Sequence, residues 1–190
     1  MGRVHPQITP QLRDFISAQH VFFVATAPLA DDGRVNVSPK GVDGTSLVVD
    51  AHTFAYLDIT ASGAETIAHL RENGRITVMF CAFEGKPKIV RLHGRGRVVQ
   101  SDAPEFAAWA SRFEGVAASP AHRAVIVVDV ARVSDSCGFG VPFMSFEGER
   151  RMLVAHAERH GAEGVRAYQR QKNLTSIDGL PALNLPTPHP

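Results

Sequence analysis

Three polar side chains of different chemistry alternate along one short segment, at Asn36, Ser38 and Lys40. In a β-strand over residues 35–41 these side chains point to the same face, so an amide, a hydroxyl and an ammonium group lie together. Several donors and a positive charge suit a phosphate group. Pro39 removes one donor of the sheet, which predicts a strand end, an edge strand or a bulge. An ordinary exposed edge strand is the alternative.

A second group of hydroxyls follows Asp58, where the chain leaves a predicted strand. Ser62 and Glu65 have the spacing of a capping box, which predicts a helix that begins here and ends at Asn73–Gly74. Its first turn presents free N–H groups beside Ser62 and Thr66, an arrangement that binds anions. Ser62 as a simple helix cap is the other interpretation, and Asp58 either accepts from a ligand N–H or caps the loop.

Basic side chains form a stripe along a predicted strand over residues 88–100. Arg91, His93, Arg95 and Arg97 fall on one face of this strand. The strand also contains Gly94 and Gly96, which predict a bulge, a bend or a close approach of another backbone segment. The stripe is either a solvated face or a contact with a ligand or a second subunit.

The composition limits the classes of function. The chain has 190 residues, 44% hydrophobic and 21% charged, with a net charge of +1, which fits one globular domain with an elaborated tail. A charge near zero argues against nucleic acid as a partner, and no apolar run reaches the roughly 20 residues of a membrane-spanning helix. Two cysteines, Cys81 and Cys137, make no disulfide framework, so we expect a cytoplasmic protein without a metal site.

Familiar catalytic motifs are absent from the sequence. It contains no GxSxG nucleophile elbow, no Walker loop, no HExxH motif and no GxGxxG fingerprint. We therefore assign no catalytic residue and expect any reaction to belong to a bound cofactor.

The predicted elements are short strands joined by turns, which favours an antiparallel barrel. Thr9–Pro10 predicts a helix start. Phe106, Trp109 and Phe113 form a helical stripe that is typical of a core or a subunit interface. The predicted strands cover residues 21–27, 35–41, 47–49, 53–58, 75–83, 88–100 and 124–133. Two helical segments, 149–160 and 162–172, precede an extended arm that holds four prolines.

Taken together, these segments resemble the FMN-binding split-barrel proteins related to pyridoxamine 5′-phosphate oxidase, and within them an oxidase-like branch. The resemblance extends over nearly the whole chain. The segments that carry it are 33–41, 56–58, 65–80, 91–96, 137–142 and 173–181.

The resemblance implies a mainly β fold with peripheral helices, an antiparallel six-stranded split β-barrel. Residues 1–146 would form the split-barrel flavin-binding domain, and residues 147–190 a C-terminal helical segment and extended arm of the same domain. It also implies a homodimer with FMN in the clefts between subunits. The cofactor-binding residues expected on this basis are Asn36, Val37, Ser38, Lys40, Leu57, Asp58, Ser62, Thr66, Arg91, Cys137 and Gly138.

Within this set, Ser38, Lys40 and Thr66 would hold the phosphate, and the backbone around Val37 and Leu57–Asp58 would meet the flavin ring. Arg91 or the loop 137–142 would come from the partner subunit.

The resemblance implies an FMN-dependent oxidoreductase that transfers a hydride or electrons between a nicotinamide donor and a small molecule. The chain departs from true pyridoxamine phosphate oxidases at its end, Leu183-Asn184-Leu185-Pro186, which lacks their substrate-binding arginine and tryptophan. Vitamin B6 oxidation is therefore not expected. A deazaflavin-binding reductase on the same fold, and a non-catalytic barrel that binds an anion or cofactor, are the alternatives.

Overall fold

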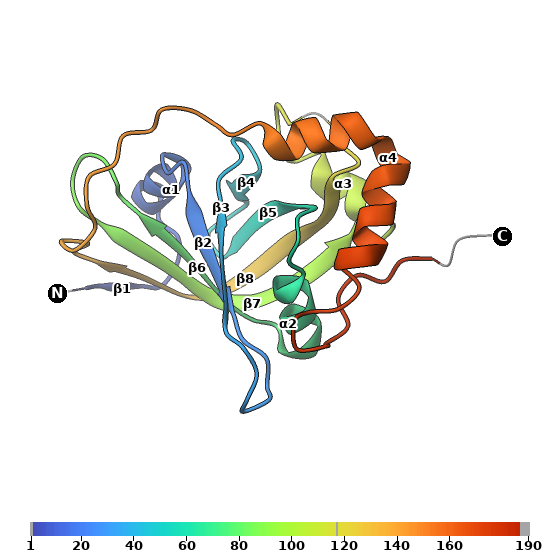
Figure 1. The fold of residues 1–190 in the computed structure, drawn as a ribbon. Helices are drawn as coiled ribbons and strands as arrows, with labels where there is room; N and C mark the ends of the chain where they lie inside the picture. Colours follow the sequence, from blue (N-terminus) through green and yellow to red (C-terminus); the bar gives the residue numbers. More distant parts are fainter. Residues whose placement is uncertain (1, 117, 187–190) are drawn as a thin grey trace.

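One antiparallel sheet forms the body of the molecule in the computed structural model, which describes residues 2–116 and 118–186 (Figure 1). The strand order is β3-β2-β6-β7-β8-β5-β4, and β1 pairs with β8. The sheet curls into a half-barrel, which confirms the predicted fold class. The strands are β1 (Val4–His5), β2 (Phe22–Thr26), β3 (Asn36–Lys40), β4 (Ser46–Val48), β5 (Thr53–Ile59), β6 (Arg75–Cys81), β7 (Ile89–Gln100) and β8 (His122–Ser136).

Within the described residues the sheet has eight strands, where the resemblance implied six and the pattern along the chain predicted seven. β4 corresponds to the predicted strand over residues 47–49, so β1, with two residues, is the strand that the pattern lacked. β1 was not predicted, because two residues carry no readable alternation. It is held in place by Asp135, whose carboxylate accepts from the Arg3 N–H at 3.0 Å and lies 3.0 Å from His5 Nε2.

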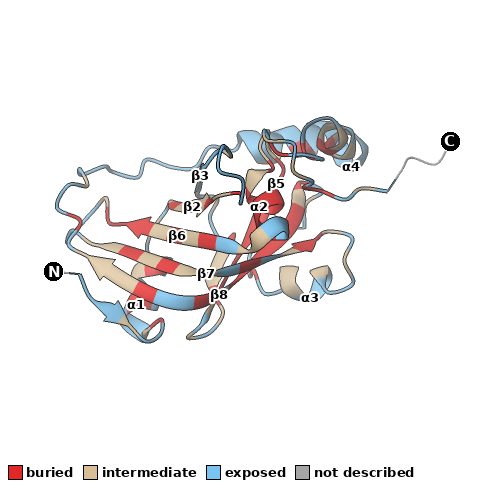
Figure 2. Ribbon diagram, turned by 90° about the horizontal axis from the view of Figure 1, so that it is seen from below, coloured by how far each residue is buried: buried red, intermediate tan, exposed pale blue. Residues whose placement is uncertain are grey.

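The main core lies on the inner face of the curled sheet. Alternate residues of the strands point there, and four aromatic rings from three of the strands meet at its centre. The ring centroid of Phe22 lies 5.5–5.7 Å from those of Phe54, Tyr56 and Phe80. The strands carry most of the buried residues, whereas the long C-terminal helix is largely exposed (Figure 2).

Two short helices agree with the local signals in the sequence. α1 (Pro10–Ser17) begins after Thr9, whose hydroxyl accepts from the Leu12 N–H at 3.3 Å, as predicted. α2 (Glu65–Asn73) ends at Gly74, which has φ 71° and so adopts the left-handed conformation that glycine permits. The predicted end of this helix is confirmed.

The remaining helices cover the outer face and one end of the sheet. α3 (Phe106–Ala110) brings Phe106 and Trp109 against a second cluster that includes Phe113, which confirms the predicted core role of this stripe. α4 (Met152–Lys172) contains a kink at Gly161 that separates the two predicted helical segments. No helix in the described ranges is both long and apolar enough to span a membrane.

The two glycines of the basic strand predicted a bulge, a bend or a close backbone approach, and the structure has a close approach at Gly94 opposite a bulge in the neighbouring strand β8. The register between β7 and β8 shifts at His93/Gly94, because Arg132 pairs with His93 and Val130 with Gly94, which leaves Ala131 as the extra residue. Glycine is required there, since a Cβ atom on Gly94 would lie 2.1 Å from the Asp129 carbonyl oxygen.

The C-terminal arm is more ordered than the sequence indicated. Residues 173–176 and 180–183 form a hairpin with an isolated bridge between Thr175 and Pro181. Residues 187–190, the end of the predicted arm, lie outside the described residues.

Candidate functional site

The edge strand β3 has the geometry that its alternation predicts. It stands at one end of the strand order and pairs with β2, so Pro39 costs no internal sheet bond. Asn36, Ser38 and Lys40 share the partly buried face, while the side chains of Val35 and Val37 lie on the other, more than half exposed.

Asn36 joins this strand to α2 through a network of buried hydroxyls. Its amide nitrogen donates to Thr26 Oγ1 and to Thr66 Oγ1, both at 3.1 Å, and its oxygen accepts from Ser38 at 2.9 Å. Thr26 Oγ1 in turn lies 2.9 Å from Nδ1 of His69. Burial lowers the pKa of His69, which keeps the ring neutral and able to accept from Thr26 at Nδ1.

Lys40 continues the same face into a buried ion cluster. Its ammonium donates to Asp58 Oδ1 at 2.9 Å, and Arg123 Nε donates to Asp58 Oδ2 at 2.7 Å. Asp58 has no exposed surface and Arg123 is 4% exposed. Burial alone would raise the pKa of the Asp58 carboxyl, but the charges of Arg123 and Lys40 outweigh it and lower the pKa to about 2. Two cations and one anion leave the cluster with a net charge of +1.

The start of α2 differs from the predicted capping box. The residue at the N-cap is Ala64, which makes no side-chain cap bond, so Ser62 lies outside the helix and the capping interpretation of Ser62 is wrong. Glu65 Oε1 instead accepts from the N–H of Ile177 at 3.2 Å. The loop before the helix is fastened from behind, because Asn173 Nδ2 donates to the Ala61 carbonyl at 2.8 Å.

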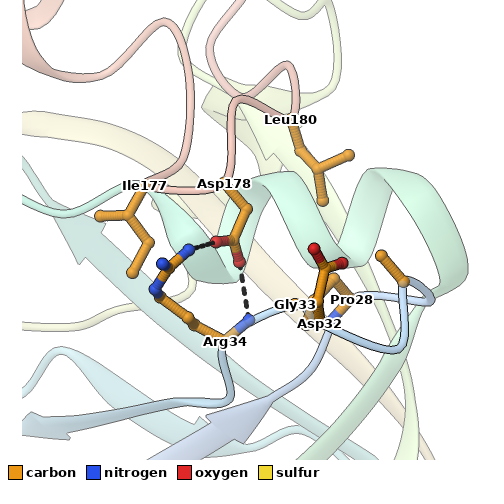
Figure 3. A pocket seen from close by; sticks show the side chains of 8 residues that line it. Pro28, Asp32, Gly33, Arg34, Ile177, Asp178 and Leu180 are labelled. Carbon is orange, nitrogen blue, oxygen red and sulfur yellow. Dashed lines mark hydrogen bonds and ion pairs between the residues drawn. The ribbon is translucent and has the colours of Figure 1, made fainter.

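Two open clefts flank the tip of the C-terminal hairpin. The first, of about 330 Å³, lies between the β2–β3 loop and the hairpin (Figure 3). The second, of about 480 Å³, lies between β3 and the start of α2. Arg34 and Ile177 line both clefts. The second cleft is lined by Arg34, Val35, Asn36, Val37, Ser62, Gly63, Glu65 and Ile177.

Comparison with known families assigns this architecture. A sequence profile of pyridoxamine 5′-phosphate oxidase matches residues 8–137, which span the sheet from α1 to the end of β8. The chain belongs to the pyridoxamine 5′-phosphate oxidase family. The resemblance inferred from the sequence is therefore confirmed.

Individual proteins are also similar to this chain. A pyridoxamine 5′-phosphate oxidase family protein of Aspergillus flavus, ustO, is 41% identical over 195 residues, 95% of this chain and 77% of that protein. The crystal structure of a HupZ variant from Group A Streptococcus has a TM-score of 0.55 and 24% identity, over 68% of this chain and 99% of that one. An FMN-binding protein from Syntrophomonas wolfei is more distant, with a TM-score of 0.47 and 14% identity over 64% of this chain and 80% of that one.

The structure brings together most of the cofactor-binding residues that were predicted on β3 and around the start of α2. Asn36, Val37 and Ser62 line the second cleft, and hydrogen bonds of Asn36 connect Ser38 and Thr66 to it. Leu57, however, points to the outer core, and its N–H donates to the Thr45 carbonyl at 2.8 Å.

The remaining predicted residues lie apart from this cleft within one subunit. Arg91 stands on the outer face of β7, opposite to buried Val90 and Leu92, and donates to Ser136 at 3.2 Å. Cys137 is exposed. Gly138 approaches β7 closely, since a Cβ atom there would lie 2.8 Å from the Lys88 nitrogen.

Sequence reasoning missed Arg123, Arg34 and the hairpin tip. Arg123 precedes an apolar strand and belongs to no motif, but a register shift at Asp58/Ile59 makes it an extra residue between the pairs of β5 and β8. An arginine at the start of an otherwise apolar strand was the available signal, since such a charge is buried only when it is paired. Arg34 and the hairpin tip gave no such signal, because they meet across 144 residues.

Proposed function

We propose that the chain binds FMN in the second cleft and acts as an FMN-dependent oxidoreductase. The observation that carries this proposal is the cleft itself, which Asn36 and Val37 of β3 line together with Ser62 from the loop before α2. Its volume of about 480 Å³ falls in the range of small-molecule sites. FMN, when bound, supplies hydride or electron transfer, and we propose a nicotinamide donor and a small-molecule acceptor as its partners.

The donor set around α2 suits a phosphate. The helix begins at Glu65, which lines the cleft, and in the part of the chain that the structure describes its start has no side-chain cap bond. Ser62 adds a hydroxyl beside the first N–H groups. The cluster of Lys40, Asp58 and Arg123 lies behind the same loop, and Arg123 Nη1 is 3.5 Å from the Ala61 carbonyl oxygen. Its net positive charge and the helix dipole both favour an anion at this point.

Lys40 lies behind the proposed phosphate site and does not contact the phosphate directly. Its ammonium is bonded to Asp58, so we propose that it contributes positive potential, while Ser62 and the helix N–H groups contact the phosphate. Thr66 and Ser38 are held by Asn36 and would fix the position of the strand against the helix. The exposed valines, Val35 and Val37, offer an apolar wall for a ring system.

A comparison of FMN with riboflavin tests the phosphate site. Riboflavin has the same ring but no phosphate, so we expect the protein to bind FMN at least tenfold more tightly, measured by fluorescence titration. Ser62→Ala should weaken FMN binding about tenfold and leave riboflavin binding unchanged, since a hydrogen bond to a charged group contributes about 1.5 kcal/mol or more. Ser17→Ala, at an exposed position of α1, is the matched control.

Other outcomes of this titration decide against the proposal. Equal affinity for FMN and riboflavin would exclude the phosphate site at α2. Failure to bind either flavin would exclude the flavin itself, and mass analysis of the purified protein would then reveal a deazaflavin if the first alternative holds. Binding of simple anions alone, with a steep salt dependence, would favour the non-catalytic barrel.

We also propose that the protein is a homodimer, in which Arg91, Cys137 and Gly138 complete the cleft of the partner subunit. Support comes from the segment that joins β8 to α4 and from the first turn of α4, which together expose several large apolar side chains. Such a patch is typical of an interface. These side chains are Phe139, Phe143, Met144, Phe146, Met152 and Leu153.

Light scattering during size-exclusion chromatography tests the dimer. We expect a mass of twice the 20.5 kDa of the chain. Phe143→Glu should shift the protein toward a monomer, because its side chain is 84% exposed in one subunit and would be buried by the partner. Gln11→Glu, which adds the same charge at an exposed position of α1, should not. A monomer in the wild type would overturn the dimer, and with it the roles given to Arg91, Cys137 and Gly138.

A cytoplasmic location is part of the same proposal.

A further inference from the structure

The C-terminal hairpin has a fixed base. The N–H of Ala182 donates to the Leu174 carbonyl at 2.8 Å, and that of Leu183 to the Asn173 carbonyl at 3.0 Å. Asn173, Ala182 and Leu183 are at most 5% exposed, and the last two belong to the main core. The base therefore cannot move without opening the core.

The tip of the same hairpin, Ile177–Gly179, is bound quite differently. Asp178 accepts from the Arg34 N–H at 2.8 Å and forms an ion pair with the Arg34 guanidinium (Figure 3). On the other side, the Ile177 N–H donates to Glu65 at 3.2 Å. The tip is thus held against the β2–β3 loop by the contacts of Asp178 with Arg34, and against the start of α2 by the contact with Glu65.

Ile177 is placed as a contact residue for a ligand. Its side chain is 67% exposed and lines both clefts, so it stands where they adjoin. Contact with a ligand would stabilise such a side chain, because it removes apolar surface from water. Within the described residues nothing covers this surface, although the backbone on both sides of Ile177 is fixed.

We propose that the hairpin tip is the wall that selects the second substrate by size, with Ile177 as its contacting side chain and the Arg34–Asp178 pair as the latch that holds it. The proposal rests on the function proposed above. The substrate class it implies is an uncharged molecule with a flat apolar body, because Ile177 offers an apolar surface and the nearby charge of Asp178 is neutralised by Arg34.

Hydrogen exchange tests the latch on the protein without any ligand. Asp178→Asn removes the ion pair but keeps the shape of the side chain, so amide exchange over residues 176–180 should accelerate about tenfold. Asp32→Asn is the control, because it changes another carboxylate that lines the first cleft beside Asp178, and it should leave amide exchange of the hairpin tip unchanged. Equal exchange in Asp178→Asn and wild type would overturn the latch.

Quinones of two sizes test the wall on the FMN-saturated protein. The dithionite-reduced protein is mixed anaerobically with 1,4-benzoquinone or menadione, and two electrons and two protons pass to the quinone to give the hydroquinone and oxidised FMN. Ile177→Gly should raise the rate constant with menadione about tenfold relative to that with benzoquinone, and Ile177→Phe should lower this ratio. Val4→Gly, at an exposed valine on β1, should leave the ratio as in wild type.

The outcomes separate the two proposals. If FMN binds and the ratio is the same in wild type, Ile177→Gly and Ile177→Phe, the wall is wrong and the flavin site stands. If wild-type protein does not bind FMN, the proposed function and the wall that rests on it both fall.

Discussion

Asp58→Asn is expected to destabilise the protein by about 3–5 kcal/mol, the usual cost of removing one partner of a buried ion pair. Asp58 has no exposed surface, and its carboxylate accepts from Lys40 and Arg123 at 2.9 and 2.7 Å. Without the negative charge, two cations remain side by side, and Arg123 is 4% exposed and cannot reach water. Urea unfolding at pH 7 measures the loss, and Asp14→Asn, at an exposed position of α1, is the control.

The pH dependence of the same variant gives an independent readout. The pKa of Asp58 falls from an ordinary 3.8 to about 2 in the folded protein, so its contribution to stability is complete above about pH 4 and is lost as the pH falls toward 2. This pH-dependent contribution of Asp58 to the free energy of unfolding amounts to about 2 kcal/mol. The stability difference between wild type and Asp58→Asn should therefore narrow over that interval. A difference that stays constant from pH 7 to pH 2 would show that Asp58 does not act through its charge.

The cluster of Lys40, Asp58 and Arg123 shows which features of the site could be predicted from the sequence and which could not. The face shared by Asn36, Ser38 and Lys40 was predictable because alternation along a strand is a local property. The partners of Lys40 were not, since Asp58 is 18 residues away and Arg123 reaches Asp58 across 65 residues through a register shift. The sequence therefore identified the groups suited to a phosphate but not that the ammonium is already paired.

The prediction of a capping box at the start of α2 was wrong for a related reason. Ser62 and Glu65 have capping-box spacing, but Glu65 binds the Ile177 N–H, 112 residues away, and the helix begins at Glu65 itself. A tertiary contact here replaces the local one. The basic stripe and the aromatic stripe of α3 were read correctly as faces of their elements, because their periodicity alone decides which side they occupy.

Gly94→Ala is expected to cost about 3 kcal/mol or more, at the upper end of overpacking effects. The added Cβ atom would lie 2.1 Å from the Asp129 carbonyl oxygen and 2.9 Å from its carbonyl carbon. These atoms belong to the backbone of β8, so no side chain can turn away to make room. Relief requires β7 and β8 to separate at the bulge, where the register shifts between His93 and Gly94. Urea unfolding measures the loss.

Gly140→Ala is the matched control, since a Cβ atom there meets nothing within 4 Å and the position has no left-handed φ. Its stability should equal that of wild type. The extra residue of the bulge lies on β8, so the alternation of β7 is unbroken and Arg91, His93 and Arg95 share one face of the strand. If Arg91 completes the partner's cleft, separation of β7 from β8 would displace it, and a folded Gly94→Ala protein should form the dimer more weakly than wild type. Unchanged stability in Gly94→Ala would mean that the backbone of β8 yields at Asp129, and the close approach of the two strands at Gly94 would then not be rigid.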